Sequence, residues 1–176
     1  MLPLLQNFID EYRNLKDLLL QNDELSLQTS VESHFTKTFL LSCASYHESR
    51  IKEILQSFFR QNGQQDERIY YFANNKGIER QYHTYFQWDQ KNINNFLGLF
   101  GNKFKEMVCK EIDNDEHIKK CMIAFLTIGN ERNKMVHENF IAYKLDKTFD
   151  EIVSLNELAT EFIDYIGKKF GYTARS

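Results

Sequence analysis

The stretch that decides the fold reads CMIAFLTIGNERNKMVHEN and covers residues 121–139. Apolar residues in and just before this stretch recur every three or four positions, which is the spacing of one helix face. That face holds Ile118, Cys121, Met122, Phe125, Gly129 and Val136. Arg132 falls on the same face, and an unpaired charge is costly to bury. The pattern therefore predicts a packed helix that directs an arginine toward a partner or a water-filled site.

His137 follows Arg132 by five residues, about 140° around an ideal helix. Both positions fall where a packed helix should place apolar side chains, and two interpretations fit. Arg132 forms a salt bridge to a neighbouring helix while His137 interacts with the dipole at the helix end. Alternatively, arginine's reach or an unwound last turn brings both side chains to one ligand. Gly129, one turn before Arg132, permits another helix to approach closely.

The composition favours one long-helical domain. The chain has 176 residues, of which 42% are hydrophobic and 14% aromatic, so disorder is not expected. The single proline and only seven glycines favour long, uninterrupted helices. The net charge of −3 argues against a broad basic surface for nucleic acids, although a small local groove could still hold RNA.

Cysteine usage and hydropathy exclude several classes of protein. The three cysteines form no CxxC pair, and their odd number argues against zinc or a disulfide framework. Cys43 and Cys121 fall on expected buried faces. No carboxylate–histidine cluster has metal spacing, so we expect no metal and no cofactor. No apolar run approaches the length of a membrane span. The first residues have acidic side chains by Asp10 and lack the basic start of a signal peptide, so we expect no signal peptide here. We expect a cytoplasmic protein with no membrane partner.

Helical spacing predicts four long helices. The first, second and fourth cover roughly residues 3–21, 28–61 and 148–169, and the third begins at DNDEH, residues 113–117, and carries the stripe from Ile118 to Val136. Asp113 or Asp115 is expected to cap the third, and Thr148 with Glu151 makes a capping box for the fourth. Between 63 and 112 we expect short helices around an irregular aromatic segment, with strands as the alternative. The expected fold is an all-α, up-and-down bundle of four long helices with a short helical insertion, in a single domain covering 1–176.

Three polar residues of the second helix are further candidates. His47 lies on the apolar stripe, which favours a satisfied core histidine over a functional one. Glu48 is either the acidic partner that holds Arg132 or part of a solvated face. Tyr46, His47, Glu48 and Lys134 are the residues that we expect to support the site or bind substrate.

Aromatic residues gather in the insertion. They are Tyr70, Tyr71, Phe72, Tyr82, Tyr85, Phe86 and Trp88. Such a cluster can stack nucleic-acid bases, but packing of the insertion onto the bundle is the favoured interpretation. We expect His34, His83 and His117 to be surface residues.

The segment ERNKMVHE, residues 131–138, resembles the motif of the HEPN superfamily, an arginine followed after four to six residues by a histidine. Arg132 and His137 fill those positions, and Asn133 fills the polar position directly after the arginine. The order of helices matches as well. LSCASYHESRIKEIL at 41–55 and WDQKNINNFLGLFG at 88–101 resemble the RiboL-PSP-like branch of HEPN proteins. The resemblance covers roughly residues 30–170.

This resemblance implies a metal-independent endoribonuclease that acts as a toxin or phage-defence effector. Arg132 would stabilise the negative charge of the transition state, His137 would act as base, and Asn133 would orient the histidine or contact phosphate. HEPN nucleases usually dimerise, so we expect a homodimer whose motifs face one RNA cleft, together with a separate antitoxin or regulatory protein. The alternatives are a non-catalytic HEPN dimer that binds a nucleotide or a partner protein, and a plain helical adaptor.

Overall fold

The computed structural model describes residues 3–172, and all of its regular structure is helical. The elements are α1 (Pro3–Gln21), α2 (Leu25–Asn62), α3 (Glu67–Phe72), the π-helix η1 (Ala73–Ile78), α4 (Tyr82–Tyr85), α5 (Asn94–Gly98), α6 (Asn102–Asn114), α7 (Glu116–His137) and α8 (Phe149–Lys169). The predicted all-α fold is confirmed. The segment before Trp88 contains no strand, and α2 begins three residues earlier than expected, at Leu25.

Local sequence signals fix several helix ends. Asp115 caps α7, because its Oδ1 accepts hydrogen bonds from the backbone N–H groups of His117 and Ile118 at 2.9 and 3.0 Å. Thr148 and Glu151 form the predicted capping box of α8. The two caps fix the starts of α7 and α8, which pack against each other.

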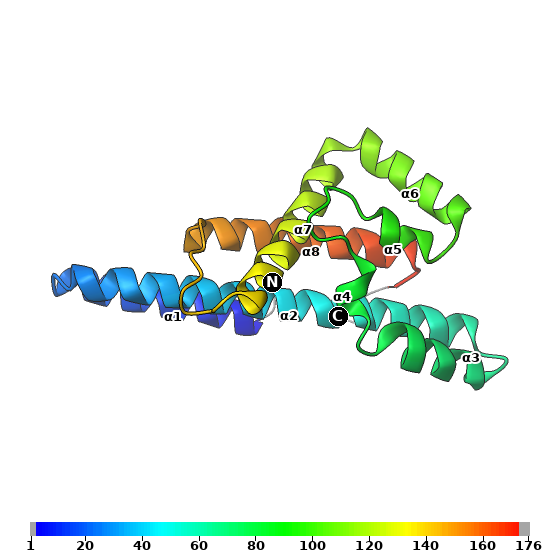
Figure 1. The fold of residues 1–176 in the computed structure, drawn as a ribbon, viewed down its shortest axis with the longest axis horizontal. Coiled ribbons are helices and arrows are strands. Elements are labelled where there is room, and N and C mark those ends of the chain that lie inside the picture. Colours follow the sequence, from blue (N-terminus) through cyan, green and yellow to red (C-terminus); the bar gives the residue numbers. More distant parts are fainter. Residues whose placement is uncertain (1–2, 173–176) are drawn as a thin grey trace.

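Four long helices form the bundle (Figure 1). α1 packs along the first half of α2, and α8 packs against both α2 and α7. α7 runs obliquely across α2 and α8 in this view, with its C-terminal end close to the middle of α2 (Figure 1). The insertion, from α3 to α6, occupies the other end of the molecule. This arrangement brings the motif at the end of α7 next to the middle of α2.

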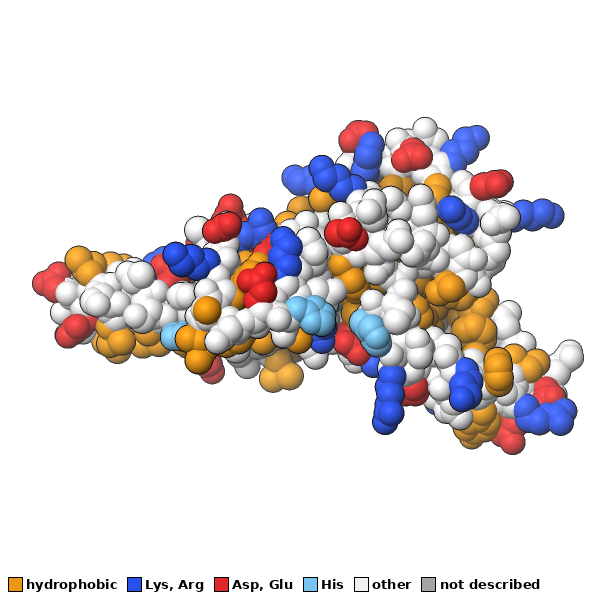
Figure 2. Space-filling model, in the orientation of Figure 1, with side chains coloured by type: hydrophobic (Ala, Val, Ile, Leu, Met, Phe, Trp, Pro, Cys, Tyr) orange, Lys and Arg blue, Asp and Glu red, His pale blue; other side chains and the backbone are white. Residues whose placement is uncertain are grey.

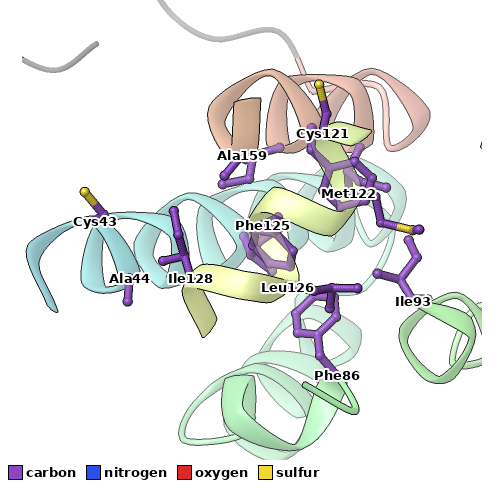
Figure 3. Packing of buried hydrophobic residues seen from close by; sticks show 14 of the residues in the cluster. Cys43, Ala44, Phe86, Ile93, Cys121, Met122, Phe125, Leu126, Ile128 and Ala159 are labelled. Carbon is purple, nitrogen blue, oxygen red and sulfur yellow. The ribbon is translucent and has the colours of Figure 1, made fainter. Parts of the chain in front are cut away.

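The core is built around the apolar face of α7 (Figure 3). Its Cys121, Met122, Phe125, Leu126 and Ile128 lie between helices α2 and α8 and the insertion. Each of these five side chains is at most 4% exposed. Cys43 and Cys121 are both buried, as predicted.

The buried face of α7 turns away from the expected stripe near its end. Val136 is 54% exposed, whereas Met135, which was not predicted to be buried, is completely enclosed. His137 is exposed, so the prediction that it falls on the buried side of the helix is wrong. The buried face continues to Met135, two residues before the helix ends, and the last two residues are exposed. Hydrophobic spacing alone does not show where a helix leaves its neighbours.

Candidate functional site

A small polar cavity lies where α2, α7 and the segment around α4 meet. Its volume is about 160 Å³. It is lined by Ala44, His47, Glu48, Arg80, Tyr82, His83, Trp88, Phe125, Ile128, Gly129, Arg132 and Asn133. The cavity brings together four of the seven residues singled out from the sequence, namely His47, Glu48, Arg132 and Asn133.

Arg132 is half-buried in the wall of this cavity. Its Nη1 donates a hydrogen bond to Oδ1 of Asn133 at 3.1 Å. Within residues 3–172 no carboxylate lies within salt-bridge distance of the guanidinium, which is therefore left to water or a ligand. Asn133 thus contacts the arginine, and within residues 3–172 it makes no hydrogen bond to His137.

His137 is the last residue of α7, and it is not among the residues that line the cavity. The following residue, Glu138, is extended and closes the helix with a hydrogen bond from its N–H to the carbonyl of Lys134 at 2.9 Å. The two halves of the motif therefore have different surroundings: Arg132 faces an enclosed polar space, and His137 faces the surface.

The two polar cavity residues of α2 have different roles. His47 is 1% exposed, and its Nε2 lies 3.0 Å from Oδ1 of Asn156 on α8. Burial lowers the pKa of His47 to about 4, so the imidazole is neutral at pH 7 and is a satisfied core histidine, as favoured. Glu48 forms a salt bridge with Lys52 at 2.7 Å, and no salt bridge joins it to Arg132.

Tyr46 and Lys134 do not line the cavity. Tyr46 is half-buried on α2, and burial raises the pKa of its phenol. Lys134 forms a salt bridge with Glu131 at 3.0 Å on the exposed side of α7. Lys134 is part of the motif segment, whereas Tyr46 lies near Arg50, Asp164 and Tyr172, and neither borders the cavity around Arg132.

Trp88 holds the insertion against α7. An added Cβ at Gly129 would lie 2.0 Å from two ring carbons of Trp88, so only glycine permits this contact. The indole N–H of Trp88 donates to the carbonyl oxygen of His83 at 3.2 Å. The sequence predicted a close approach at Gly129, but the approaching group is an indole ring and not another helix. As favoured, Tyr82, Tyr85, Phe86 and Trp88 pack onto the bundle, whereas Tyr71 and Phe72 stay exposed.

Arg80 and His83 line the cavity although sequence reasoning did not connect them with the motif. Arg80 has a φ of 62°, a left-handed conformation that typically costs an L-residue about 1–3 kcal/mol. Between them in the chain lies Tyr82. Burial raises the pKa of its phenol, the charge of Glu48 raises it further, and the charge of Arg132 opposes both. The phenol thus lies within the field of both charges.

The loop that follows the motif is attached to the bundle at two points. Lys37 on α2 is 4% exposed, and its ammonium donates to the carbonyl oxygens of Phe140 and Ile141 at 3.0 and 3.4 Å. The hydroxyl of Tyr143 donates to Glu131 at 2.6 Å. Burial raises the pKa of Glu131, but hydrogen bonds from Tyr143 and Lys134 outweigh it and lower the pKa.

The face that Figure 2 shows has no broad basic patch among the described residues. In Figure 2, lysine and arginine side chains alternate with acidic ones over the visible face. Two histidine side chains lie close together near the middle of that face, in the region where Figure 1 places α4 and the end of α7.

A second group of polar side chains lies at the opposite end of α7. His117, Cys121 and Glu161 have donor atoms that all lie within 4.8 Å of one another. Nε2 of His117 is 2.7 Å from the Glu161 carboxylate, a hydrogen bond that already accounts for both side chains. The sequence did not reveal this group, because Glu161 comes from α8, 44 residues after His117.

These features define an all-α protein that presents an arginine in a small polar cavity between two long helices and an insertion. The chain matches the family model described as RiboL-PSP-HEPN over residues 6–172, and it belongs to this family of HEPN domains. Comparisons with curated proteins and with solved structures gave no significant match. Membership suggests a function of the ribonuclease or nucleotide-binding type. None of the helices in residues 3–172 is long and apolar enough to cross a membrane.

Proposed function

We propose that the protein is a metal-independent endoribonuclease that acts as a toxin or phage-defence effector. The observation that carries this proposal is Arg132. Its half-buried guanidinium lines a polar cavity, and the residues around it offer no carboxylate at ion-pair distance. A half-buried cation that has no ion-pair partner within residues 3–172 attracts an anion, and phosphate matches the planar fork of a guanidinium.

The reaction requires one base and a way to stabilise charge. The 2′-hydroxyl of RNA loses its proton to His137 and attacks the adjacent phosphorus. The bond from phosphorus to the 5′-oxygen breaks and this oxygen takes up a proton from a general acid, leaving a 2′,3′-cyclic phosphate and a 5′-hydroxyl. Arg132 stabilises the negative charge that gathers on the phosphoryl oxygens, and Asn133 fixes the orientation of the guanidinium. Histidine is the side chain that changes charge between pH 5 and 8, which suits the base.

A homodimer would bring two motifs to one RNA. Apolar side chains beside the motif support this part of the proposal: Val136 is 54% exposed and Ile141 is 82% exposed, on either side of His137 and the end of α7. Two such surfaces related by a two-fold axis would bury these side chains against each other. Val136→Asp with Ile141→Asp should then give a monomer that does not cleave RNA, while Leu99→Asp, at an exposed site on the insertion, should leave the dimer intact.

A second candidate function follows from the position of His137. This residue is not among those that line the cavity with Arg132. A protein that binds a nucleotide or a partner through Arg132, without cleaving RNA, would require only that arginine. The two functions differ in whether His137 is needed, and a cleavage assay separates them.

The test is cleavage of an end-labelled RNA by the purified protein in excess EDTA, beside His137→Ala and the matched variant His34→Ala. His34 is an exposed histidine on α2. We expect the wild type and His34→Ala to cut and to leave a 2′,3′-cyclic phosphate, and His137→Ala not to cut. Equal cutting by His137→Ala, or a requirement for added metal, would contradict the proposal.

A further inference from the structure

We propose that Arg80 and His83 complete the phosphate site begun by Arg132 within the same chain. The ligand is one phosphodiester of single-stranded RNA. Arg80 contacts the phosphate, and His83 gives a proton to the 5′-oxygen as it leaves. This inference rests on the proposed function and assigns two residues of the insertion to its site.

The size and charge of the cavity select a phosphate. Pockets that hold whole small molecules usually measure about 300–1,000 Å³. The cavity here is about 160 Å³, enough for a phosphate with part of a ribose and too small for a nucleotide with its base. Two arginines, Arg80 and Arg132, are among the residues that line it. The carboxylate of Glu48 is paired with Lys52, so the balance of charge favours an anion.

The backbone at Arg80 supports a role for its side chain. Apart from glycine, residues 3–172 contain two positions with positive φ, Asp23 in the turn between α1 and α2 and Arg80 beside the cavity. Glycine would adopt this conformation without strain. Arg80 is exposed, and within residues 3–172 its side chain makes no hydrogen bond or ion pair. A strained backbone beside a cavity, at a residue whose cation has no partner within residues 3–172, is a feature of binding sites.

His83 provides an imidazole that His137 does not provide in this cavity. Its carbonyl oxygen accepts the hydrogen bond from Trp88, which fixes the backbone of α4 against α7. Its side chain is exposed at the cavity wall and has no hydrogen bond within residues 3–172. With His137 as base, the proton of the 2′-hydroxyl moves to His137. Protonated His83 then supplies the proton that the 5′-oxygen takes when its bond to phosphorus breaks.

Binding is tested without cleavage by using a fluorescent RNA in which every 2′-hydroxyl is methylated. We expect Arg80→Gly to weaken its binding about tenfold, to an extent similar to Arg132→Ala, because each substitution removes a cation that binds phosphate. The slope of log affinity against log salt should fall by about 0.7 for each phosphate of a single strand that is no longer neutralised. Arg13→Ala on α1 is the matched control and should bind as the wild type does.

The variant Arg80→Gly also separates binding from folding. Because it relieves the positive φ, its melting temperature should equal or exceed that of the wild type, as should that of Asp23→Gly. Unchanged affinity and salt slope in Arg80→Gly would overturn the assignment of Arg80. Failure of the wild type to bind this RNA would overturn the site as a whole.

The role of His83 is tested with an RNA that carries sulfur in place of the bridging 5′-oxygen at one position. A thiolate leaves without protonation, so it needs no acid. We expect His83→Ala to cleave ordinary RNA about 100-fold more slowly and to cleave the sulfur-containing RNA nearly as fast as the wild type. His137→Ala should be slow on both. Equal slowness of His83→Ala on both substrates would overturn its role as the acid.

The two assays distinguish this inference from the proposed function. If the wild type binds methylated RNA through Arg80 but cleaves no RNA, the nuclease function and the role of His83 fail while the phosphate contact of Arg80 stands. If the wild type cleaves RNA and neither Arg80→Gly nor His83→Ala changes binding or cleavage, the nuclease function stands and the inference fails.

Discussion

Two hollows on the molecule share the helix α4 but differ in size and chemistry. The larger measures about 780 Å³, and its wall is mostly apolar, with Ile69, Phe72 and Leu99 among its residues. Orange side chains mark this part of the surface between α5 and α3 in Figure 2. The smaller, about 160 Å³, is the polar cavity of Arg132. The size of a hollow therefore says little about its chemistry, since the smaller one has the larger share of charged residues: Glu48, Arg80 and Arg132 line it, whereas Arg68 and Lys76 are the charged residues in the much larger apolar hollow.

The difference arises from how the insertion turns. Thr84 and Tyr85 of α4 line the apolar hollow, while Tyr82 and His83 of the same short helix line the polar cavity. The hydroxyl of Tyr85 donates to the carbonyl oxygen of Gly77, which fixes α4 to the end of η1. One short helix thus separates an apolar surface, suited to contacts with protein, from a polar cavity suited to an anion.

The largest effect is expected on the rate of RNA cleavage, which should depend on the polar cavity and not on the apolar hollow. Arg132→Ala should lower the rate of RNA cleavage by about 10²–10³-fold, because it removes a preorganised charge from the transition state. Leu99→Ser, in the apolar hollow, should leave the rate unchanged. Initial rates on one end-labelled RNA would measure both. A comparable loss in Leu99→Ser would mean that the apolar hollow takes part in the reaction.

The next effect is the pH dependence of stability from His47, which lines the polar cavity. Its folded pKa is about 4, against an ordinary value of 6.5, so between these values the unfolded state binds a proton that the folded state does not. Stability should fall by up to about 3 kcal/mol as the pH drops from 6.5 to 4. Urea unfolding at several pH values measures this fall. His47→Gln should be less sensitive to pH in this window, and an equal slope would contradict the assignment.

A smaller effect is expected from the contact that closes the polar cavity. Gly129→Ala places a Cβ within the ring of Trp88, which must move, and such overpacking typically costs about 1–3 kcal/mol. Gly98→Ala is the control, since an added Cβ there meets nothing within 4 Å. Thermal unfolding measures the loss. Because Trp88 is the single tryptophan, its fluorescence should change in Gly129→Ala and stay the same in Gly98→Ala.

The smallest effect is expected in the apolar hollow. Phe72 is 72% exposed, so Phe72→Ser should change the free energy of unfolding by no more than about 0.5 kcal/mol and leave RNA cleavage unchanged. Urea unfolding and the cleavage assay together check this. A clear loss of stability would show that Phe72 is covered in solution, for example by a second copy of the chain.

The long helices could be predicted because their signals are local. The periodic apolar positions of α1 and α8, and the capping box at Thr148 and Glu151, involve residues within a turn or two of each other. The burial of Cys43 and Cys121 followed from the same spacing. His47 was correctly expected in the core, although its partner Asn156 lies 109 residues away and was not predicted.

The cavity wall formed by the insertion could not be predicted, because no local signal connects it with the motif. Arg80 and His83 lie about fifty residues before Arg132, and no spacing rule connects them. They meet because Trp88 packs on Gly129, and the sequence showed only that something approaches this glycine. The exposure of His137 was missed because the bundle contacts of α7 end before the helix does. The roles of Arg132, Asn133 and His137 in a reaction stay predictions.

The central claim is that RNA phosphate enters the polar cavity, and a nitrogen–proton correlation spectrum tests it most directly. The protein has one tryptophan, so the indole N–H of Trp88 gives a single identifiable signal in the wall of that cavity. On titration with 2′-O-methylated RNA, the signals of Trp88 and of the Arg132 side chain should shift together. Shifts confined to backbone signals around Phe72 and Leu99 would contradict the account, because they would place the RNA in the apolar hollow.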